Sequence, residues 1–432
     1  MEHYTLVVSD IHLSRVIANE APYLTYRQPR FLPDNDLARL IINIAGLSRG
    51  TREGGIEIVF NGDIFDFDAS DPAVPRGYRP GEARVHETAN NAASSVRRIA
   101  HILNDHPMFV NAVRFALNQG CNVVFIAGNH DAQLNFPQVQ QFLRHHAFAC
   151  PAESGATGQQ GVTLRTWFHQ TRDGIHIEHG HLYDPFCTLN LPEPHEQLED
   201  TMGSVTARYL PAMFPNMNPH AVNPFPAFGG TSQGPKELLA TWMSTQDDGV
   251  AGVAAAKFLR GLMTVEGHPI QKDSLVRAAA AETGADIQKI TRHASLLPAK
   301  GNFADFVRGK EWSDYAGKTS RRLQQASRHI ASIYGARAVV MGHTHDAYGL
   351  RESGIFFGNS GSWTPAAPGF DTKTPAESEF DDKKKGSFIW LKSSPGELIR
   401  GGAFDWTDRG VFPVAQPITW AYPAGLSRQR RE

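Results

Sequence analysis

The chain has 432 residues, with 42 Lys and Arg against 44 Asp and Glu, so its formal net charge at pH 7 is −2. Charged residues make up 20% and hydrophobic residues 41% of the sequence, a composition typical of globular proteins and not of disordered ones. The near-neutral charge disfavours a globally basic nucleic-acid binder. The length predicts one large domain or two moderate ones.

We expect a cytoplasmic location. The sequence contains no run of 18 apolar residues, so no transmembrane helix is predicted. The first residues lack the basic flank and apolar core of a secretory signal. The three cysteines are widely spaced, so they predict neither a disulfide framework nor a CxxC zinc site.

Short apolar runs rich in β-branched residues predict buried strands along most of the chain. Five of them end in clusters of Asp, Asn or His, at residues 4–9, 56–61, 122–127, 174–178 and 336–341. Helical patterns at 37–47 and 82–119, the second interrupted near Pro107, separate the first three runs. Strands that alternate with helices predict an α/β core. Two more strands are expected at 354–357 and 387–392.

The alternation breaks in the middle of the chain, where no strand pattern occurs between about residues 185 and 328. A segment rich in Pro, Asn and Phe at 210–228 is followed by helical patterns at 235–263, 272–282, 286–297 and 314–335. We therefore predict a core made of residues 1–184 and 332–432, divided by a mainly helical insertion at 185–331. The insertion is a candidate lid or dimer element.

The polar clusters at the strand ends carry the chemistry. In chain order they are Asp10-Ile11-His12, Gly62-Asp63-Ile64-Phe65-Asp66, Gly128-Asn129-His130-Asp131, His179-Gly180-His181 and Gly342-His343-Thr344-His345. In open α/β sheets, ligands bind at the carboxyl ends of the strands, where the loops converge. Each cluster alone is typical of an ordinary turn, but five in order at strand ends predict a shared site.

The residue types in these clusters favour a metal centre. On an extended segment, side chains two apart point the same way, so Asp10 with His12, and His343 with His345, would each form a chelating pair. Carboxylate, amide oxygen and imidazole together suit borderline first-row metals such as Mn, Fe, Zn or Ni. The absence of cysteine from the set disfavours a closed structural zinc site.

In these five clusters the sequence resembles the calcineurin-like metallophosphoesterase superfamily. The family pattern runs D-x-H, G-D-x-x-D, G-N-H-[DE], H and G-H-x-H, and each part occurs here in order, within residues 4–184 and 332–365. The segment Asn359-Ser360-Gly361-Ser362-Trp363 also resembles the end of the family's core. The resemblance implies a four-layer α/β-β/β sandwich with the helical insertion as an addition to it.

The resemblance also implies a dinuclear centre that holds two divalent or mixed-valence metal ions. One ion would be bound by Asp10, His12, Asp63 and His345, and the other by Asp63, Asn129, His179 and His343, with Asp63 bridging both. Such a pair supports in-line attack of a metal-bridging hydroxide on a phosphoester. His130 corresponds to the family's catalytic histidine, and Asp131 is a candidate to orient it.

The expected activity is hydrolysis of a phosphodiester, or else of a monoester or pyrophosphate, in a small-molecule, nucleotide or lipid substrate. Phe67-Asp68 stands where the superfamily's protein Ser/Thr phosphatases have Arg-Gly, which disfavours that branch. Pyrophosphatases of the lipid A pathway usually have Arg at the position of His130, which disfavours them too.

Two rival functions stay open. A nuclease of the DNA-repair type uses the same Gly-Asn-His-Asp sequence, although the near-neutral charge makes nucleic acid a less favoured substrate. A catalytically silent metal-binding scaffold would keep the fold without turnover. The metal pair, the substrate and the oligomeric state are not fixed by these motifs.

Overall fold

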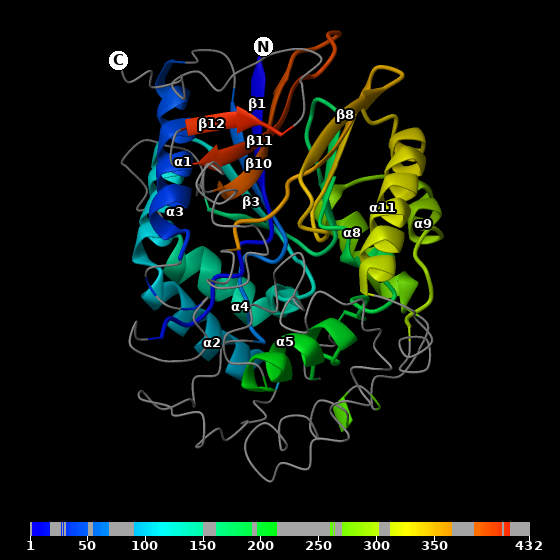
Figure 1. The fold of residues 1–432 in the computed structure, drawn as a ribbon. Helices are drawn as coiled ribbons and strands as arrows, with labels where there is room; N and C mark the ends of the chain where they lie inside the picture. Colours follow the sequence, from blue (N-terminus) through cyan, green and yellow to red (C-terminus); the bar gives the residue numbers. More distant parts are fainter. Residues whose placement is uncertain are drawn as a thin grey trace, which may run out of the picture.

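The computed structural model contains two β-sheets in a mixed α/β arrangement (Figure 1). It describes residues 2–17, 27, 29, 32–50, 55–68, 90–149, 161–191, 197–213, 260–261, 263, 270–301, 312–364, 384–407 and 410–414. The first sheet has the order β12-β11-β10-β1-β2-β3-β4. Its strands are β1 (His3–Val8), β2 (Ile56–Asn61), β3 (Asn122–Ile126), β4 (Thr163–Arg165), β10 (Lys384–Ser393), β11 (Arg400–Thr407) and β12 (Gly410–Pro413).

The second sheet has the order β5-β6-β7-β9-β8. Its strands are β5 (Phe168–Gln170), β6 (Ile175–Glu178), β7 (Ala338–Met341), β8 (Tyr348–Glu352) and β9 (Ile355–Asn359). Strands β1 to β4 are parallel, and so are β6, β7 and β9. The loops that follow β1, β2 and β3 therefore leave one edge of the first sheet, and those that follow β6 and β7 leave one edge of the second.

Helices lie along the outer side of each sheet (Figure 1). Those beside the first sheet are α1 (Asp34–Gly46), α2 (Ala92–Asp105), α3 (Pro107–Asn118) and α4 (Pro137–Phe142). Those beside the second are α8 (Lys272–Thr283), α9 (Ile287–Ala294) and α11 (Trp312–Tyr334). A further helix, α5 (Met202–Met213), crosses near the edge where the candidate residues lie.

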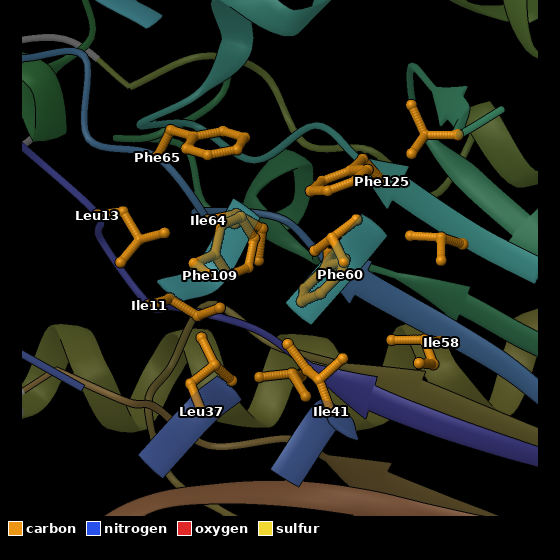
Figure 2. Close-up of a cluster of buried hydrophobic side chains, with 14 of the residues drawn as sticks. Ile11, Leu13, Leu37, Ile41, Ile58, Phe60, Ile64, Phe65, Phe109 and Phe125 are labelled. Atoms are coloured by element: carbon orange, nitrogen blue, oxygen red, sulfur yellow. The ribbon is translucent and has the colours of Figure 1, made fainter. Parts of the chain in front are cut away.

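Three groups of buried side chains hold these elements together. The largest joins the first sheet to α1, α2 and α3 and includes Ile58, Phe60 and Phe125 (Figure 2). A second, with Val59 and Val340, fills the space between the two sheets. The third packs Val339 and Met341 of β7 against α8, α9 and α11. Strands buried on both faces need apolar residues at successive positions, which explains the unbroken apolar runs of β2 and β7.

Most of the expected elements occur where the patterns place them. Strand β2 has the expected bounds, and α8, α9 and α11 match three of the expected helices to within a few residues. Pro107 is the first residue of α3, where its missing N–H leaves no helical bond unmade. The described residues between 185 and 331 contain helices and no strand. The division into core and insertion stays a prediction.

The sequence analysis missed seven of these strands and helices: β4, β5, β8, β11, β12, α4 and α5. Strands β4 and β5 have three residues each, too few for a periodic pattern. The expected helical pattern at 235–263 lies almost wholly outside the described residues, as do most of the segment 210–228 and the start of the region 82–119. Among the described helices, none combines the length and apolarity needed to cross a membrane.

Phe60 offers a test of the packing in the first sheet. Its ring is fully buried and lies 4.7 Å from that of Phe125 and 5.4 Å from that of Phe109, measured between centroids. We expect Phe60→Ala to lower the free energy of unfolding by about 3–5 kcal/mol, because it removes buried area and leaves a cavity. Ile42→Ala on α1, where Ile42 is 40% exposed, serves as control and should cost about 0.5 kcal/mol. Equal losses in chemical denaturation would contradict this packing.

Candidate functional site

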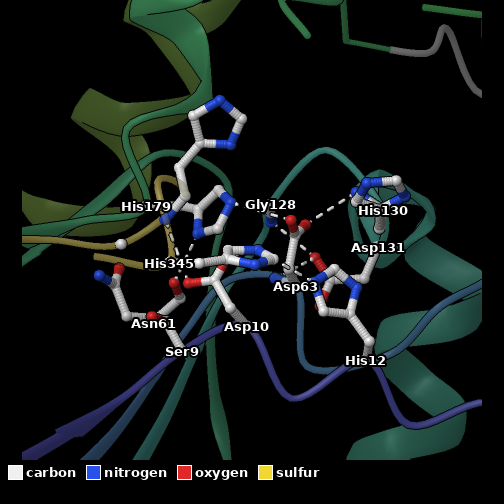
Figure 3. Close-up of polar contacts among 12 residues, drawn as sticks. Ser9, Asp10, His12, Asn61, Asp63, Gly128, His130, Asp131, His179 and His345 are labelled. Atoms are coloured by element: carbon white, nitrogen blue, oxygen red, sulfur yellow. Dashed lines mark hydrogen bonds and ion pairs between the residues drawn. The ribbon is translucent and has the colours of Figure 1, made fainter. Parts of the chain in front are cut away.

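The candidate residues lie in loops that directly follow the carboxyl ends of five strands. Asp10 and His12 follow β1, Asp63 follows β2, and His179 follows β6. Asn129 and His130 follow β3, and His343 and His345 follow β7. The two parallel sets of strands thus deliver these residues to one region, in which Asp63 occupies a central place (Figure 3).

The candidate residues form three overlapping groups. Within each group, the potential ligand atoms lie within 4.8 Å of one another. The groups are Asp10 with His12 and His345, His12 with Asp63 and His130, and Asp63 with His179 and His343. The first and third groups correspond to the two ligand sets that the family resemblance implies. His343 and His345 belong to different groups, so they do not act as one chelating pair. The ligand roles of these residues stay a prediction.

Close contacts between nitrogen and oxygen atoms link the groups. His345 Nε2 lies 3.0 Å from Asp10 Oδ1, and His179 Nε2 lies 3.2 Å from Asp63 Oδ2. His12 Nε2 and His345 Nε2 are 3.4 Å apart. Around a tetrahedral cation with bonds of about 2.0–2.1 Å, neighbouring ligand atoms lie about 3.3 Å apart. Each of these pairs of atoms is therefore spaced like two ligands of one ion.

The backbone is left-handed at several of the candidate residues. The described non-glycine residues with positive φ are Asp10 (53°), His12 (53°), Asp63 (52°), His343 (70°), His345 (58°) and Ser353 (49°). Five of these six are candidate ligands. The assumption that Asp10-Ile11-His12 and His343-Thr344-His345 are extended was therefore wrong. Each strained residue costs about 1–3 kcal/mol, and such strain is concentrated at functional sites.

Burial makes the charges in the site interdependent. Asp10, Asp63 and His179 are each no more than 1% exposed. Burial alone would raise the pKa of the Asp63 carboxyl, but the charges of His179 and His130 hold it well below its ordinary value. Burial alone would lower the pKa of His179, but the carboxylates of Asp63 and Asp10 raise it to about 9. The site therefore keeps its carboxylates ionised only with positive charge beside them.

Two features of the site fit bound cations. Asn129 is 5% exposed, and its Oδ1 accepts no hydrogen bond from the residues that the structure describes. Buried polar atoms normally have a partner, so an oxygen left in this state beside carboxylates and imidazoles fits a metal ligand. Gly128 lies so close to Asp63 that a Cβ there would collide with the carboxylate and backbone of Asp63. These donors and this close approach fit borderline divalent ions.

His130 lies beside Asp63 but contacts a different carboxylate through its ring. Its backbone N–H donates to Asp63 Oδ1 (2.8 Å), and its Nδ1 lies 3.5 Å from Asp68 Oδ2. Asp68 in turn accepts a hydrogen bond from Arg208 of α5 (3.0 Å). Burial alone would lower the pKa of His130, but the carboxylates of Asp63 and Asp68 raise it to about 10.

Asp131 makes a different set of contacts from the one expected. Its carboxylate accepts hydrogen bonds from the backbone N–H groups of Gly128 (2.6 Å), Ile64 (2.8 Å), Asp63 (3.2 Å) and Phe65 (3.3 Å). It therefore ties the loop after β2 to the loop after β3. Its expected role in orienting His130 stays a prediction.

Sequence reasoning missed Asp68, Arg208 and Asp184 as residues of the site. Asp184 Oδ2 lies 3.1 Å from His343 Nε2. In metal sites, a carboxylate often accepts a hydrogen bond from one ring nitrogen of a histidine whose other nitrogen binds the metal. Asp68 lies just after the Gly-Asp-x-x-Asp motif, where its departure from the phosphatase pattern was the only signal. Nothing in the sequence marks Arg208, which reaches the site from α5.

Comparison with known proteins adds little. No family model matches the sequence, and no curated protein matches it. One similar solved structure is that of a candidate 5′-nucleotidase from Staphylococcus aureus in complex with alpha-ketoglutarate, with 11% sequence identity and a TM-score of 0.28. The match covers 98% of this chain and 56% of that one, so the chain spans about half the length of that protein. Likeness at this TM-score supports no conclusion on fold or function.

Gly128 provides a test of the metal fit. We expect Gly128→Ala to abolish stoichiometric Mn²⁺ binding, measured by calorimetry, because the added methyl group must displace the Asp63 carboxylate. Gly46→Ala at the end of α1 is the matched control, since its Cβ would meet no atom within 4 Å. Unchanged Mn²⁺ affinity in folded Gly128→Ala protein would show that Asp63 is not a ligand.

Proposed function

We propose that this protein is a metal-dependent phosphoesterase that hydrolyses phosphodiesters at a dinuclear centre. The observation that carries the proposal is the way the groups of potential ligand atoms are linked through Asp63. Asp63 shares one group with His179 and His343 and another with His12, and His12 also belongs to the group of Asp10 and His345. A carboxylate that belongs to more than one such group is suited to bridge two cations. Of the functions considered, a two-metal hydrolase makes the fullest use of this arrangement.

The proposal includes the family and the architecture. Membership of the calcineurin-like metallophosphoesterase superfamily is supported by the five ordered motifs and by the meeting of their residues in one site. The two sheets, with helices outside each, are compatible with a four-layer sandwich. We assign residues 1–184 and 332–432 to this core and 185–331 to an insertion.

The ligand roles follow from the groups of contacts. Asp10, His12 and His345 would hold one ion, His179, His343 and Asn129 the other, and Asp63 both. Two such ions, when bound, supply Lewis-acid activation of water and neutralise charge on the phosphoryl oxygens. The ion could be Mn, Fe, Zn or Ni, all of which accept imidazole and carboxylate ligands.

His130 would act on the leaving group. Its Nδ1 lies 3.5 Å from Asp68 Oδ2, and Nε2 would be the atom that acts on the substrate. The Asp68 carboxylate beside Nδ1 favours the protonated imidazole, which can donate a hydrogen bond and then a proton to the departing oxygen. Asp68 would hold the ring in this orientation, and Asp131 would hold the two loops on which Asp63 and His130 lie.

The primary test is hydrolysis of bis-p-nitrophenyl phosphate and p-nitrophenyl phosphate after reconstitution with Mn²⁺. We expect the diester to be cleaved faster and His130→Ala to reduce kcat by about 10²–10⁴-fold. His146→Ala, at a histidine on the segment Leu143–Ala147, is the control and should leave kcat unchanged. Faster cleavage of the monoester would redirect the assignment to a phosphatase. Full Mn²⁺ loading without cleavage of either ester would favour the silent scaffold.

Arg208 tests whether α5 supports catalysis. Its guanidinium donates hydrogen bonds to Asp68 and to Asp200 (2.9 and 3.1 Å). Removal of the guanidinium would therefore leave the Asp68 carboxylate, which faces His130, less firmly held. We expect Arg208→Ala to lower kcat by about 10-fold with little change in KM, as for other residues that orient an active group. Arg208→Lys should recover part of the rate.

Arg328 on α11 provides the matched control for this experiment. It pairs with Glu352 (2.7 and 2.8 Å) at the surface, where its side chain is 47% exposed. Arg328→Ala should leave both constants unchanged. A rise in KM alone for Arg208→Ala would instead place Arg208 in substrate binding.

A further inference from the structure

A second cluster of potential metal ligands lies on the opposite side of β6 from the space between the sheets. His176 and Glu178 of β6 and His293 of α9 offer ligand atoms that lie within 4.8 Å of one another. All three side chains are buried, with no more than 1% exposure. None of them belongs to the five motifs at the strand ends, and the proposed phosphoesterase reaction does not use them.

The distances between the converging atoms match those of a tetrahedral site. His176 Nε2 and His293 Nε2 each lie 3.3 Å from Glu178 Oε1. This is about the separation of two ligands bound to one cation through bonds of about 2.0–2.1 Å. The Tyr183 hydroxyl lies 3.1 Å from Glu178 Oε1 and is hydrogen-bonded to His293 Nε2 (2.6 Å), so it provides a further oxygen atom beside these three ligand atoms.

The far side of each candidate ligand is held by another side chain. Glu178 Oε2 accepts a hydrogen bond from Trp167 Nε1 (2.8 Å). His176 Nδ1 lies 3.2 Å from Gln170 Nε2, and His293 Nδ1 lies 3.2 Å from the Tyr334 hydroxyl. Outer partners of this kind fix the orientation of metal-bound imidazoles and carboxylates. Here they leave the Nε2 atoms of His176 and His293 and the Oε1 atom of Glu178 close together.

Hydrogen bonds alone leave this cluster incompletely satisfied. His176 Nε2 is buried, and its 3.3 Å contact with Glu178 Oε1 does not count as a hydrogen bond within the described residues. Three groups crowd the single oxygen Oε1 of Glu178. The described partners of this buried carboxylate are two imidazoles, a phenol and an indole, with no lysine or arginine among them. A buried carboxylate is costly without a full positive charge beside it, and here that charge comes either from a protonated imidazole or from a bound cation.

We propose that His176, Glu178 and His293 bind a structural divalent cation, best matched by Zn²⁺, separate from the dinuclear centre. Two imidazole nitrogens with carboxylate and phenol oxygens form a donor set that zinc accepts. The ion would fasten α9 to β6 immediately before His179. It would therefore join the helical segment to the strand that presents one of the candidate catalytic ligands. The proposal does not depend on the phosphoesterase assignment.

The test measures zinc content by plasma mass spectrometry after growth with zinc and dialysis against metal-free buffer. Asp63→Asn weakens the proposed dinuclear centre and should still retain one equivalent of zinc. Adding Glu178→Gln, which keeps the shape of the side chain and an oxygen acceptor for Trp167, should remove that equivalent. Adding His169→Gln instead should not, since His169 is a similarly buried histidine on β5 that pairs with Glu57.

Cobalt provides a second measurement on Asp63→Asn protein alone, so the result does not depend on the folding of a Glu178 variant. Stoichiometric Co²⁺ should give the visible absorption of a four-coordinate site, and Zn²⁺ should displace it. Zinc retained by folded Asp63→Asn/Glu178→Gln protein would overturn the proposal. So would Asp63→Asn protein that binds neither Zn²⁺ nor Co²⁺, in which case the cluster is a hydrogen-bonded network.

Discussion

The burial of the Asp63 carboxylate constrains the rest of the structure. A charge at 1% exposure must be compensated, and the imidazoles grouped with it come from the loops after the other four strands that lead to the site. The backbone responds as well. His130 donates its N–H to Asp63, and the close approach of Gly128 leaves no room for a side chain. The left-handed backbone at Asp10, His12 and Asp63 is stored strain that the packed sheets beneath must hold in place.

The strands and helices that position the site could be predicted because their patterns are local. The apolar run of β2 is buried on both faces, with Phe60 on one side and Val59 on the other, so it stands out in the sequence. The residue types of the site were also predictable, since each cluster follows such a run. Strands β11 and β12 were not predicted. Glycines, and in β11 also charged residues, interrupt the apolar pattern, and pairing rather than local propensity makes these segments strands, since β11 pairs with β10 and β12 with β11.

What the sequence could not provide are the contacts between distant segments. Arg208 meets Asp68 across 140 positions, and His293 meets Glu178 across 115. No spacing rule connects such residues, because the connection depends on how α5 and α9 pack. The conformation of the motifs was also mispredicted. Asp10 and His12 converge through left-handed turns, which side-chain alternation along a strand does not describe.

The position of β1 in the first sheet has a consequence for how the chain acquires its structure. β1 is hydrogen-bonded on one side to β2 and on the other to β10, which begins at Lys384. During synthesis, one edge of β1 therefore stays unpaired until β10 is made, some 380 residues later. Until then, the exposed edge of β1 is a template for pairing with other chains. Folding dominated by such remote pairing is slow and prone to aggregation. Truncation before β10 should therefore yield aggregated protein, with loss of order extending back to the first strand.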